Sequence, residues 1–261
     1  MSITPQIHAL RIPFTLTIAP GRTLERFVYC HLIVGPSLCL IDSGVRDTPQ
    51  VLFDYLAAIG RDPAEIRLLV LTHAHPDHIG GARAIQQATG CRIAAHPADV
   101  PWIEDVDRQA RERPVPGFHD LVAGPVAVDV PVTDGDSLTV DATTTLQVIH
   151  TPGHARGHIA LFDATAGALF TGDSVPIPGD IPIYDDVAAA VRSVERLQAL
   201  PEVQRLFSAW DAPRAGTEVA DTLARGLAAM RHVHETVRAA QLQLLGCRSI
   251  RYLHGRAAPH R

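Results

Sequence analysis

The fold of this chain is most constrained by LTHAHPDHIGG, residues 71–81, which packs three histidines and an aspartate into six consecutive positions. The stretch continues residues 66–72, IRLLVLT, an apolar run typical of a fully buried strand. Imidazole and carboxylate groups are favoured ligands of zinc and related divalent ions. The order of these segments therefore predicts a metal-binding loop at the end of a strand, with a polar surface loop as the alternative.

The polar side chains of this loop fall into two pairs. His73 and His75 are two residues apart, so in an extended loop both side chains point to one side and can hold one ion together. Asp77 and His78 are adjacent and would serve a second ion a few ångströms away. Six residues do not supply all the ligands of two ions, so further ligands are expected elsewhere in the chain.

The amino-acid composition limits the kinds of binding partner that are expected. The 261 residues carry a net charge of −5, which provides no basic field for nucleic acid or for an anionic membrane surface. All 23 basic residues are arginine, which excludes a P-loop lysine and a Schiff-base lysine. No run of 18 apolar residues exists, so we expect no membrane-spanning helix.

The cysteines and the N-terminal sequence indicate the cellular compartment in which the protein is expected. Residues 1–16 lack the cationic and apolar regions of a secretory signal. Four cysteines are scattered without a CxxC pair, at Cys30, Cys39, Cys91 and Cys247. In a chain of this size they are expected to be reduced core thiols, which predicts a cytoplasmic protein.

Apolar patterning predicts one domain, residues 1–261, in which strands and helices come in two similar successions. Residues 105–124 are charged and then rich in Pro and Gly, so we interpret them as a lid or insertion. Such a chain fits two sheets packed together with helices outside. Strands are expected over residues 27–34, 37–42, 66–72, 91–95, 126–130, 137–140, 145–149, 158–162, 168–171 and 204–209, and helices over residues 51–59, 78–89 and 186–200.

A long amphipathic helix is expected near the C-terminus, over residues 216–245. Its apolar residues recur at spacings of three and four, at Val219, Leu223, Leu227, Met230, Val233 and Val237. This stripe predicts a helix that packs on the core. A face for a homodimer is the alternative.

Several separate motifs resemble the metallo-β-lactamase superfamily, which includes glyoxalase II and the lactonases. H-x-H-x-D-H after an apolar strand resembles the hallmark of that superfamily. Asp42 in LIDSG, His154 in HTPGHARGH and Asp173 in LFTGD resemble three further positions of its pattern, in the same order and with fitting spacing. The resemblance covers roughly residues 25–215.

This resemblance implies an α+β fold, a four-layer αββα sandwich of two mixed β-sheets packed face to face with helices outside. It also implies two divalent metal ions at one edge of the sheets. One ion would be held by His73, His75 and His154 and the other by Asp77 and His78, with Asp173 as the bridge. Asp42 would have a structural role.

The chain departs from the family pattern after the last strand. The family supplies a final histidine there to the second metal, whereas this chain reads Trp210-Asp211-Ala212-Pro213. We predict that Asp211 replaces that histidine as an oxygen ligand. A third carboxylate shifts the metal preference from zinc towards harder ions such as iron or manganese.

The resemblance implies a hydrolase in which a hydroxide shared by two metals attacks a small ester, thioester or lactone. Asp77 would also orient the hydroxide, and Tyr184 is a candidate for substrate contact through its phenol. The alternatives are an oxidoreductase resembling mononuclear iron persulfide dioxygenases and a non-catalytic metal-binding or ligand-binding member of the fold.

Overall fold

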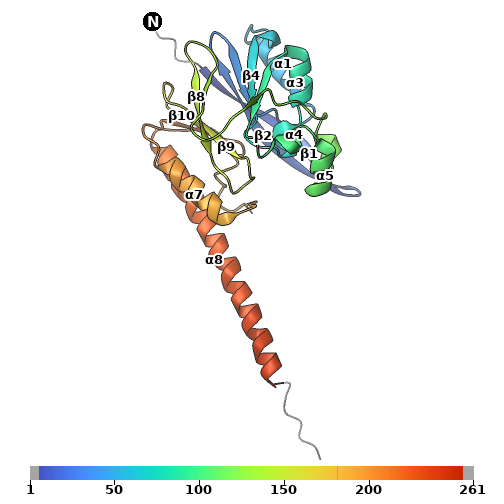
Figure 1. Cartoon of the computed structure of the whole chain (residues 1–261), viewed down its shortest axis with the longest axis vertical. Helices are drawn as coiled ribbons and strands as arrows, with labels where there is room; N and C mark the ends of the chain where they lie inside the picture. The colour runs from blue at the N-terminus through green and yellow to red at the C-terminus, as the bar shows by residue number, and fades with distance from the viewer. Residues whose placement is uncertain (1–5, 181, 255–261) are drawn as a thin grey trace, which may run out of the picture.

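The computed structural model describes residues 6–180 and 182–254, which form two six-stranded sheets with helices around them (Figure 1). In spatial order the first sheet consists of β1 (Gln6–Ala19), β2 (Arg22–Val34), β3 (Leu38–Ile41), β4 (Ile66–Val70), β5 (Arg92–Ala95) and β6 (Val130–Pro131). The second consists of β12 (Arg214–Ala215), β11 (Arg205–Ser208), β10 (Ala168–Gly172), β9 (Ile159–Asp163), β8 (Thr145–His150) and β7 (Ser137–Thr139). Both sheets are mixed, because β3 to β6 pair in parallel in the first and β10 pairs in parallel with β11 in the second.

The helices cover the outer faces of the two sheets. They are α1 (Thr48–Ala58), α2 (Pro76–Ile79), α3 (Ala82–Thr89), α4 (Val100–Ile103), α5 (Val106–Glu112), α6 (Phe118–Leu121), α7 (Val187–Gln198) and α8 (Thr217–His254), with a short 3₁₀ helix at Pro63–Glu65. Strand side chains alternate between faces, so each sheet contributes one apolar surface to the interior and one to its helices.

The buried side chains form three clusters that define four layers. The cluster between the sheets contains Ile41 and Val70 of the first sheet and Phe170 of the second. On the outer face of the first sheet, Leu52 of α1 joins another cluster. On the outer face of the second, α7 and α8 contribute the third, including Leu223. This confirms the predicted αββα sandwich.

The longest strand of the first sheet was not expected from the sequence. β1 pairs antiparallel with β2 along nearly its whole length, from Gln6 opposite Val34 to Ala19 opposite Arg22. It lies at the edge of the sheet, where Pro13 is tolerated because an edge strand leaves half of its N–H groups unpaired.

Two other expected elements differ from the structure. The helix expected over residues 78–89 is divided into α2 and α3 at Gly80 and Gly81. A Cβ atom at Gly80 would lie 2.2 Å from the carbonyl oxygen of Leu121, so the close packing of α6 requires glycine there. The strand expected over residues 126–130 is reduced to Val130–Pro131.

Residues 105–124 form α5, α6 and their connections. Val106 and Gln109 of α5 and Phe118 of α6 are buried. The N–H of Arg46 also donates to the carbonyl of Leu121 over 2.7 Å. The segment is thus packed against the first sheet and its loops, and its role as a lid stays a prediction.

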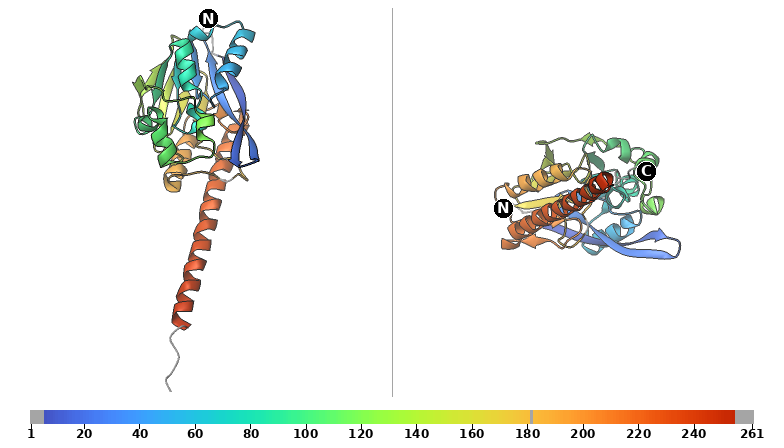
Figure 2. Two further views of the ribbon diagram at one scale, coloured as in Figure 1. Left: turned by 90° about the vertical axis from the view of Figure 1, so that its right-hand side faces the viewer. Right: turned by 90° about the horizontal axis from the view of Figure 1, so that it is seen from below.

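The last helix, α8, begins on the body of the protein and then runs away from it (Figures 1 and 2). Val219, Leu223, Leu227 and Met230 are buried, whereas Val237 is 51% exposed. The expected apolar stripe therefore packs on the core over its first half only, and a homodimer stays a prediction. None of the helices in the described residues has both the length and the apolarity needed to cross a membrane.

Candidate metal centre

The ends of several strands bring the predicted ligands to one edge of the sandwich. Asp42 follows β3, the loop from residue 71 to 78 follows β4, and Asp173 follows β10. His154 comes from the turn between β8 and β9. The two sheets are joined beside this edge by a hydrogen bond of 2.7 Å from the N–H of Tyr29 to the carbonyl of Ala209.

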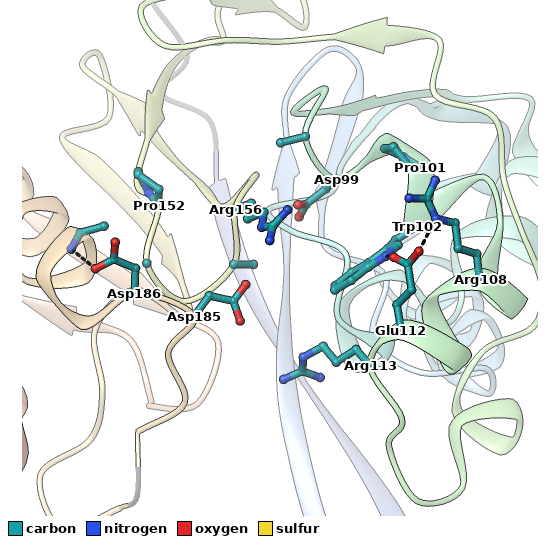
Figure 3. A pocket seen from close by; sticks show the side chains of 14 residues that line it. Asp99, Pro101, Trp102, Arg108, Glu112, Arg113, Pro152, Arg156, Asp185 and Asp186 are labelled. Carbon is teal, nitrogen blue, oxygen red and sulfur yellow. Dashed lines mark hydrogen bonds and ion pairs between the residues drawn. The ribbon is translucent and has the colours of Figure 1, made fainter. Parts of the chain in front are cut away.

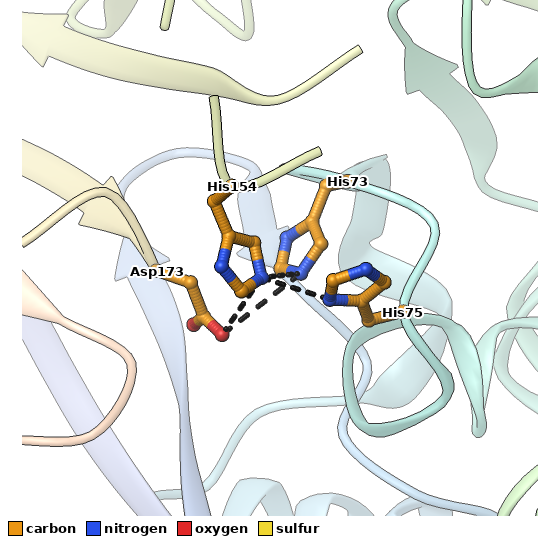
Figure 4. A group of neighbouring side chains, drawn as sticks. All are labelled: His73, His75, His154 and Asp173. Atoms are coloured by element: carbon orange, nitrogen blue, oxygen red, sulfur yellow. Dashed lines mark hydrogen bonds and ion pairs between the residues drawn. The ribbon is translucent and has the colours of Figure 1, made fainter. Parts of the chain in front are cut away.

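Four side chains converge on one point: His73, His75, His154 and Asp173 (Figure 4). One ligand atom from each lies within 4.8 Å of all the others. Nε2 of His154 lies 2.8 Å from Nδ1 of His75 and 3.2 Å from Nε2 of His73. Oδ2 of Asp173 lies 3.3 Å from Nε2 of His154 and 4.0 Å from Nε2 of His73.

These separations suit a single ion at the centre of the four atoms. A tetrahedron with metal–ligand bonds of ~2.0–2.1 Å has edges of about 3.3 Å, which falls within the range of 2.8 to 4.0 Å observed for these four distances. The tautomer of His154 also fits, because its Nδ1–H donates to the carbonyl of Ile183 over 2.9 Å and leaves the Nε2 lone pair directed at the centre.

The histidines of this cluster are neutral at neutral pH. Burial, and then the neighbouring histidine charges, lower the pKa of His73 and His75 well below the usual value of 6.5. Burial also lowers the pKa of His154. A neutral imidazole is the form that binds a metal, so no proton has to be displaced from these rings.

His78 lies beside this cluster with a carboxylate on either side. Its Nδ1 lies 2.8 Å from Oδ2 of Asp42, and its Nε2 lies 3.2 Å from Oδ1 of Asp173 and 3.7 Å from Oδ2 of Asp77. Burial would lower the pKa of His78, but the charges of Asp173, Asp42 and Asp77 raise it well above its usual value. Asp42 thus orients His78 with Nε2 directed at the second predicted metal position.

Asp173 is held by contacts on both sides. Burial alone would raise its pKa, but the charge of the adjacent His78 holds that pKa far below its usual range. Its backbone N–H donates to Nε2 of the buried His158 over 3.1 Å. The carboxylate is therefore fixed in its charged form.

Asp99 fixes the two ligand loops to each other. Its Oδ2 accepts the N–H of Ala74 and its Oδ1 accepts the N–H of Gly157, both over 2.8 Å. The buried side chain of Gln109, from α5, donates to the carbonyl of Ala74. Asp99 and Gln109 did not stand out in the sequence, and no short spacing links them to the ligands they support.

The structure does not bring Asp211 to this cluster, and its role as a ligand stays a prediction. Its carboxylate accepts two hydrogen bonds of 2.9 Å from the Nη2 atom of Arg214. The neighbouring Trp210 turns inward instead and lines a cavity with Asp173 and His154. The strand end thus presents an indole, not a carboxylate, to the second metal position.

Tyr184 lines a cavity of about 100 Å³ together with His154, Asp173 and Trp210. Burial raises the pKa of its phenol above the usual value of 10. The predicted substrate contact of Tyr184 is thus placed beside the ligands, although its hydroxyl group makes no hydrogen bond within the described residues.

A larger groove of about 870 Å³ opens next to His154 (Figure 3). One wall comes from α4 and α5, with Trp102 and Arg113, and the other from the turn that carries His154, with Arg156. Arg113 is close enough to His75 for its charge to lower the pKa of that ring. The groove therefore lies beside the turn that carries His154, although none of the four converging side chains lines it.

Comparison with known families agrees with this geometry. The sequence pattern of the "Metallo-beta-lactamase superfamily" matches residues 24–208. The chain belongs to the metallo-β-lactamase superfamily. The match includes the histidine loop, His154 and Asp173, the residues that the fold brings to one edge.

Similar curated members of this superfamily are named hydroxyacylglutathione hydrolase. The chain is 31% identical to the one from Methylococcus capsulatus over 192 residues, which is 73% of this chain and 66% of that one. It is 28% identical to the one from Cereibacter sphaeroides (strain ATCC 17025) over 183 residues, which is 70% of this chain and 62% of that one. The chain thus spans just under two thirds of the length of these relatives.

Solved structures of the superfamily share the fold. The metallo-β-lactamase family protein TTHA1429 from Thermus thermophilus superposes with a TM-score of 0.69 at 23% identity, over 89% of this chain and 81% of that one. TTHA1623, described in a di-iron-bound form, superposes with a TM-score of 0.60 at 28% identity, over 82% of this chain and 98% of that one.

Proposed function

We propose that this protein is a metal-dependent hydrolase of small thioesters, esters or lactones, with thioesters as the preferred class. The observation that carries the proposal is the convergence of His73, His75, His154 and Asp173 beside an open groove. The name of the similar relatives, hydroxyacylglutathione hydrolase, denotes the cleavage of a thioester and supports that preference.

The four converging side chains would hold a divalent ion, which we take to be zinc, with iron or manganese as the other candidates. A bound divalent ion lowers the pKa of water and polarises a carbonyl oxygen. The protein contributes three neutral imidazoles and one carboxylate. Hydrogen bonds with Thr72 and Ile183 orient the rings of His73 and His154, and His158 accepts the backbone N–H of Asp173. Fixed ligands avoid reorganisation during the reaction.

Asp77 would orient the attacking water. Its carboxylate is largely buried beside His78 and makes no bidentate pair with an arginine among the residues that the structure describes, so one oxygen can accept a hydrogen bond from water. Tyr184, in the adjacent cavity, would donate to the substrate oxygen on the opposite side.

The larger groove would bind the thiol part of the substrate. It presents the guanidinium groups of Arg113 and Arg156 together with the carboxylates of Asp185 and Asp186 (Figure 3). A small thiol that carries both carboxylate and amino groups, such as a short peptide thiol, matches this mixture of charges.

A panel of substrates with two matched histidine variants tests the function. We expect turnover of an acyl-glutathione thioester, and slower turnover of an aliphatic ester and a lactone. His154→Ala should lower kcat/KM by at least ~100-fold because it removes a converging ligand. His119→Ala, whose side chain is 68% exposed, is the control and should leave the rate unchanged. Full metal loading without turnover of any substrate would instead indicate a binding protein.

One observation favours a second candidate, an oxidoreductase that uses a single iron ion to oxidise a persulfide with oxygen. Trp210 stands where a ligand of a second ion would be needed, and such chemistry needs only one ion. Oxygen uptake with glutathione persulfide, and none of the hydrolytic activities above, would favour this candidate.

A further inference from the structure

Two neighbouring strands place Trp210 beside Asp173. β10 and β11 are parallel, with Phe170 opposite Phe207 and Gly172 opposite Ser208. The residues that follow parallel neighbours emerge at the same edge of a sheet. Asp173 directly follows the end of β10, and Trp210 follows β11 by one residue, so both side chains reach the metal edge.

The contacts of Trp210 show which way its side chain points. Its indole group lines the same cavity as Asp173 and His154. The ring centroids of Phe27 and Trp210 are 6.2 Å apart, and the guanidinium carbon of Arg26 lies 4.6 Å from the centroid of the indole. Contacts with Phe27 and Arg26 therefore hold the indole in place.

An indole group cannot serve as a metal ligand at this position. Its N–H is a donor without a lone pair for a metal, and the ring has the bulk of two fused cycles. Arg26, stacked on the indole and lining the same cavity, adds a positive charge on the side where a second divalent ion would bind. The remaining groups at this position are Asp77, His78 and the second oxygen of Asp173.

We propose that the centre binds one metal ion per chain, at His73, His75, His154 and Asp173, and that Trp210 takes the place of the second ion. This inference rests on the proposed function and deepens it. It is tested by counting bound ions and not by turnover, so the inference and the proposed function can fail independently.

Metal analysis of the purified, metal-loaded protein tests the proposal. The wild-type protein, equilibrated with excess Zn²⁺ or anaerobic Fe²⁺ and then desalted, should retain one ion per chain by elemental analysis. Trp210→His supplies an imidazole at the same position and should raise the content to two. Asp211→Ala, the neighbouring control, should keep one, because that carboxylate is paired with Arg214.

Trp210→Phe tests whether an aromatic ring at this position is enough to keep out a second ion. It keeps a ring without a metal-binding lone pair, so the content should stay at one. Two ions per wild-type chain would overturn the proposal. So would a Trp210→His protein that has a native circular dichroism spectrum but retains one ion. His78→Ala provides a second test if Trp210→His does not fold. It should retain the same one ion per chain as the wild-type protein, whereas loss of an ion in this variant would show that the wild-type protein has a second site.

Discussion

Oδ2 of Asp42 lies 2.8 Å from Nδ1 of His78, and both side chains are buried at the ends of neighbouring segments. Asp42 also accepts hydrogen bonds from the N–H and the hydroxyl of Thr72, at 2.8 to 3.0 Å. Its φ of 60° lies in the left-handed region, a conformation that aspartate tolerates better than most side chains do. One carboxylate therefore fixes both the start of the ligand loop and the ring of His78.

Asp42→Asn should lower the free energy of unfolding by about 1–3 kcal/mol, because the amide keeps the shape but presents one acceptor in place of two. Urea denaturation of the metal-loaded protein measures the change. Asp47→Asn, at an exposed aspartate without a capping hydrogen bond, is the control and should stay within about 0.5 kcal/mol. Equal effects of the two substitutions would contradict this role of Asp42.

Asp99→Ala should separate the two ligand loops. It leaves the N–H groups of Ala74 and Gly157 without an acceptor in a buried region, at a cost of about 2–5 kcal/mol for the two together. We also expect the affinity for the bound ion to fall roughly 10-fold, since His75 and His154 flank these groups. Thermal unfolding and a chelator competition measure the two effects. Unchanged metal affinity in a destabilised variant would limit Asp99 to a role in stability.

Arg113→Ala should weaken binding of charged substrates. Loss of the guanidinium group from the groove should raise KM for an acyl-glutathione thioester by about 10-fold, with kcat little changed, because the contact is remote from the reacting carbonyl. KM for an uncharged ester should stay the same. Arg111→Ala, in the last turn of α5 and outside the groove, is the matched control for Arg113, which directly follows that helix. An equal rise in KM for charged and uncharged substrates would contradict a charge-specific contact.

The buried ring of His31 predicts a pH dependence of stability. Burial, with a smaller effect of the His78 charge, lowers the pKa of His31 from 6.5 to about 3. The ring packs against Phe170 and Phe207, and its Nε2 has no hydrogen-bond partner among the described residues. Below pH 6.5 the unfolded chain binds a proton at His31, whereas the buried ring of the folded protein does not until the pH approaches 3. The contribution of neutral His31 to stability is therefore complete above pH 6.5 and is lost as the pH falls towards 3.

His31→Phe should remove this contribution. Between pH 6.5 and 4, the free energy of unfolding of the variant should fall less steeply than that of the wild-type protein. The two slopes should differ by about 1.4 kcal/mol per pH unit. Denaturation curves at several pH values give both slopes. His119→Phe, at an exposed position, should keep the wild-type slope. Parallel slopes for His31→Phe and the wild-type protein would show that His31 is not the source.

The sequence predicted those parts of the site that local spacing determines. His73, His75, Asp77 and His78 follow one strand within a few residues, so the strand end alone brings them together. The sequence did not show which of the two adjacent side chains, Trp210 or Asp211, turns inward. In the structure Arg26, far away in the sequence, lies over the indole, and Arg214 pairs with the carboxylate.

Contacts between residues far apart in the chain could not be predicted from the sequence either. Asp99 meets Ala74 and Gly157 across 25 and 58 residues, and no periodicity marks such pairs. β1 was missed because it is an edge strand whose place is set by its pairing with β2. Periodic apolar patterns predicted the layers of the sandwich, since each sheet and helix buries one face regardless of its exact partners.

Titration of metal-free protein with Zn²⁺ or Fe²⁺, followed by thioester turnover, tests the central claim most directly. Protein stripped with a chelator should be inactive, and its activity should rise linearly and break at one equivalent of the ion. His154→Ala should gain no activity at any equivalent. Turnover by the stripped protein, or a break at two equivalents, would contradict a hydrolase that works with one ion held by His73, His75, His154 and Asp173.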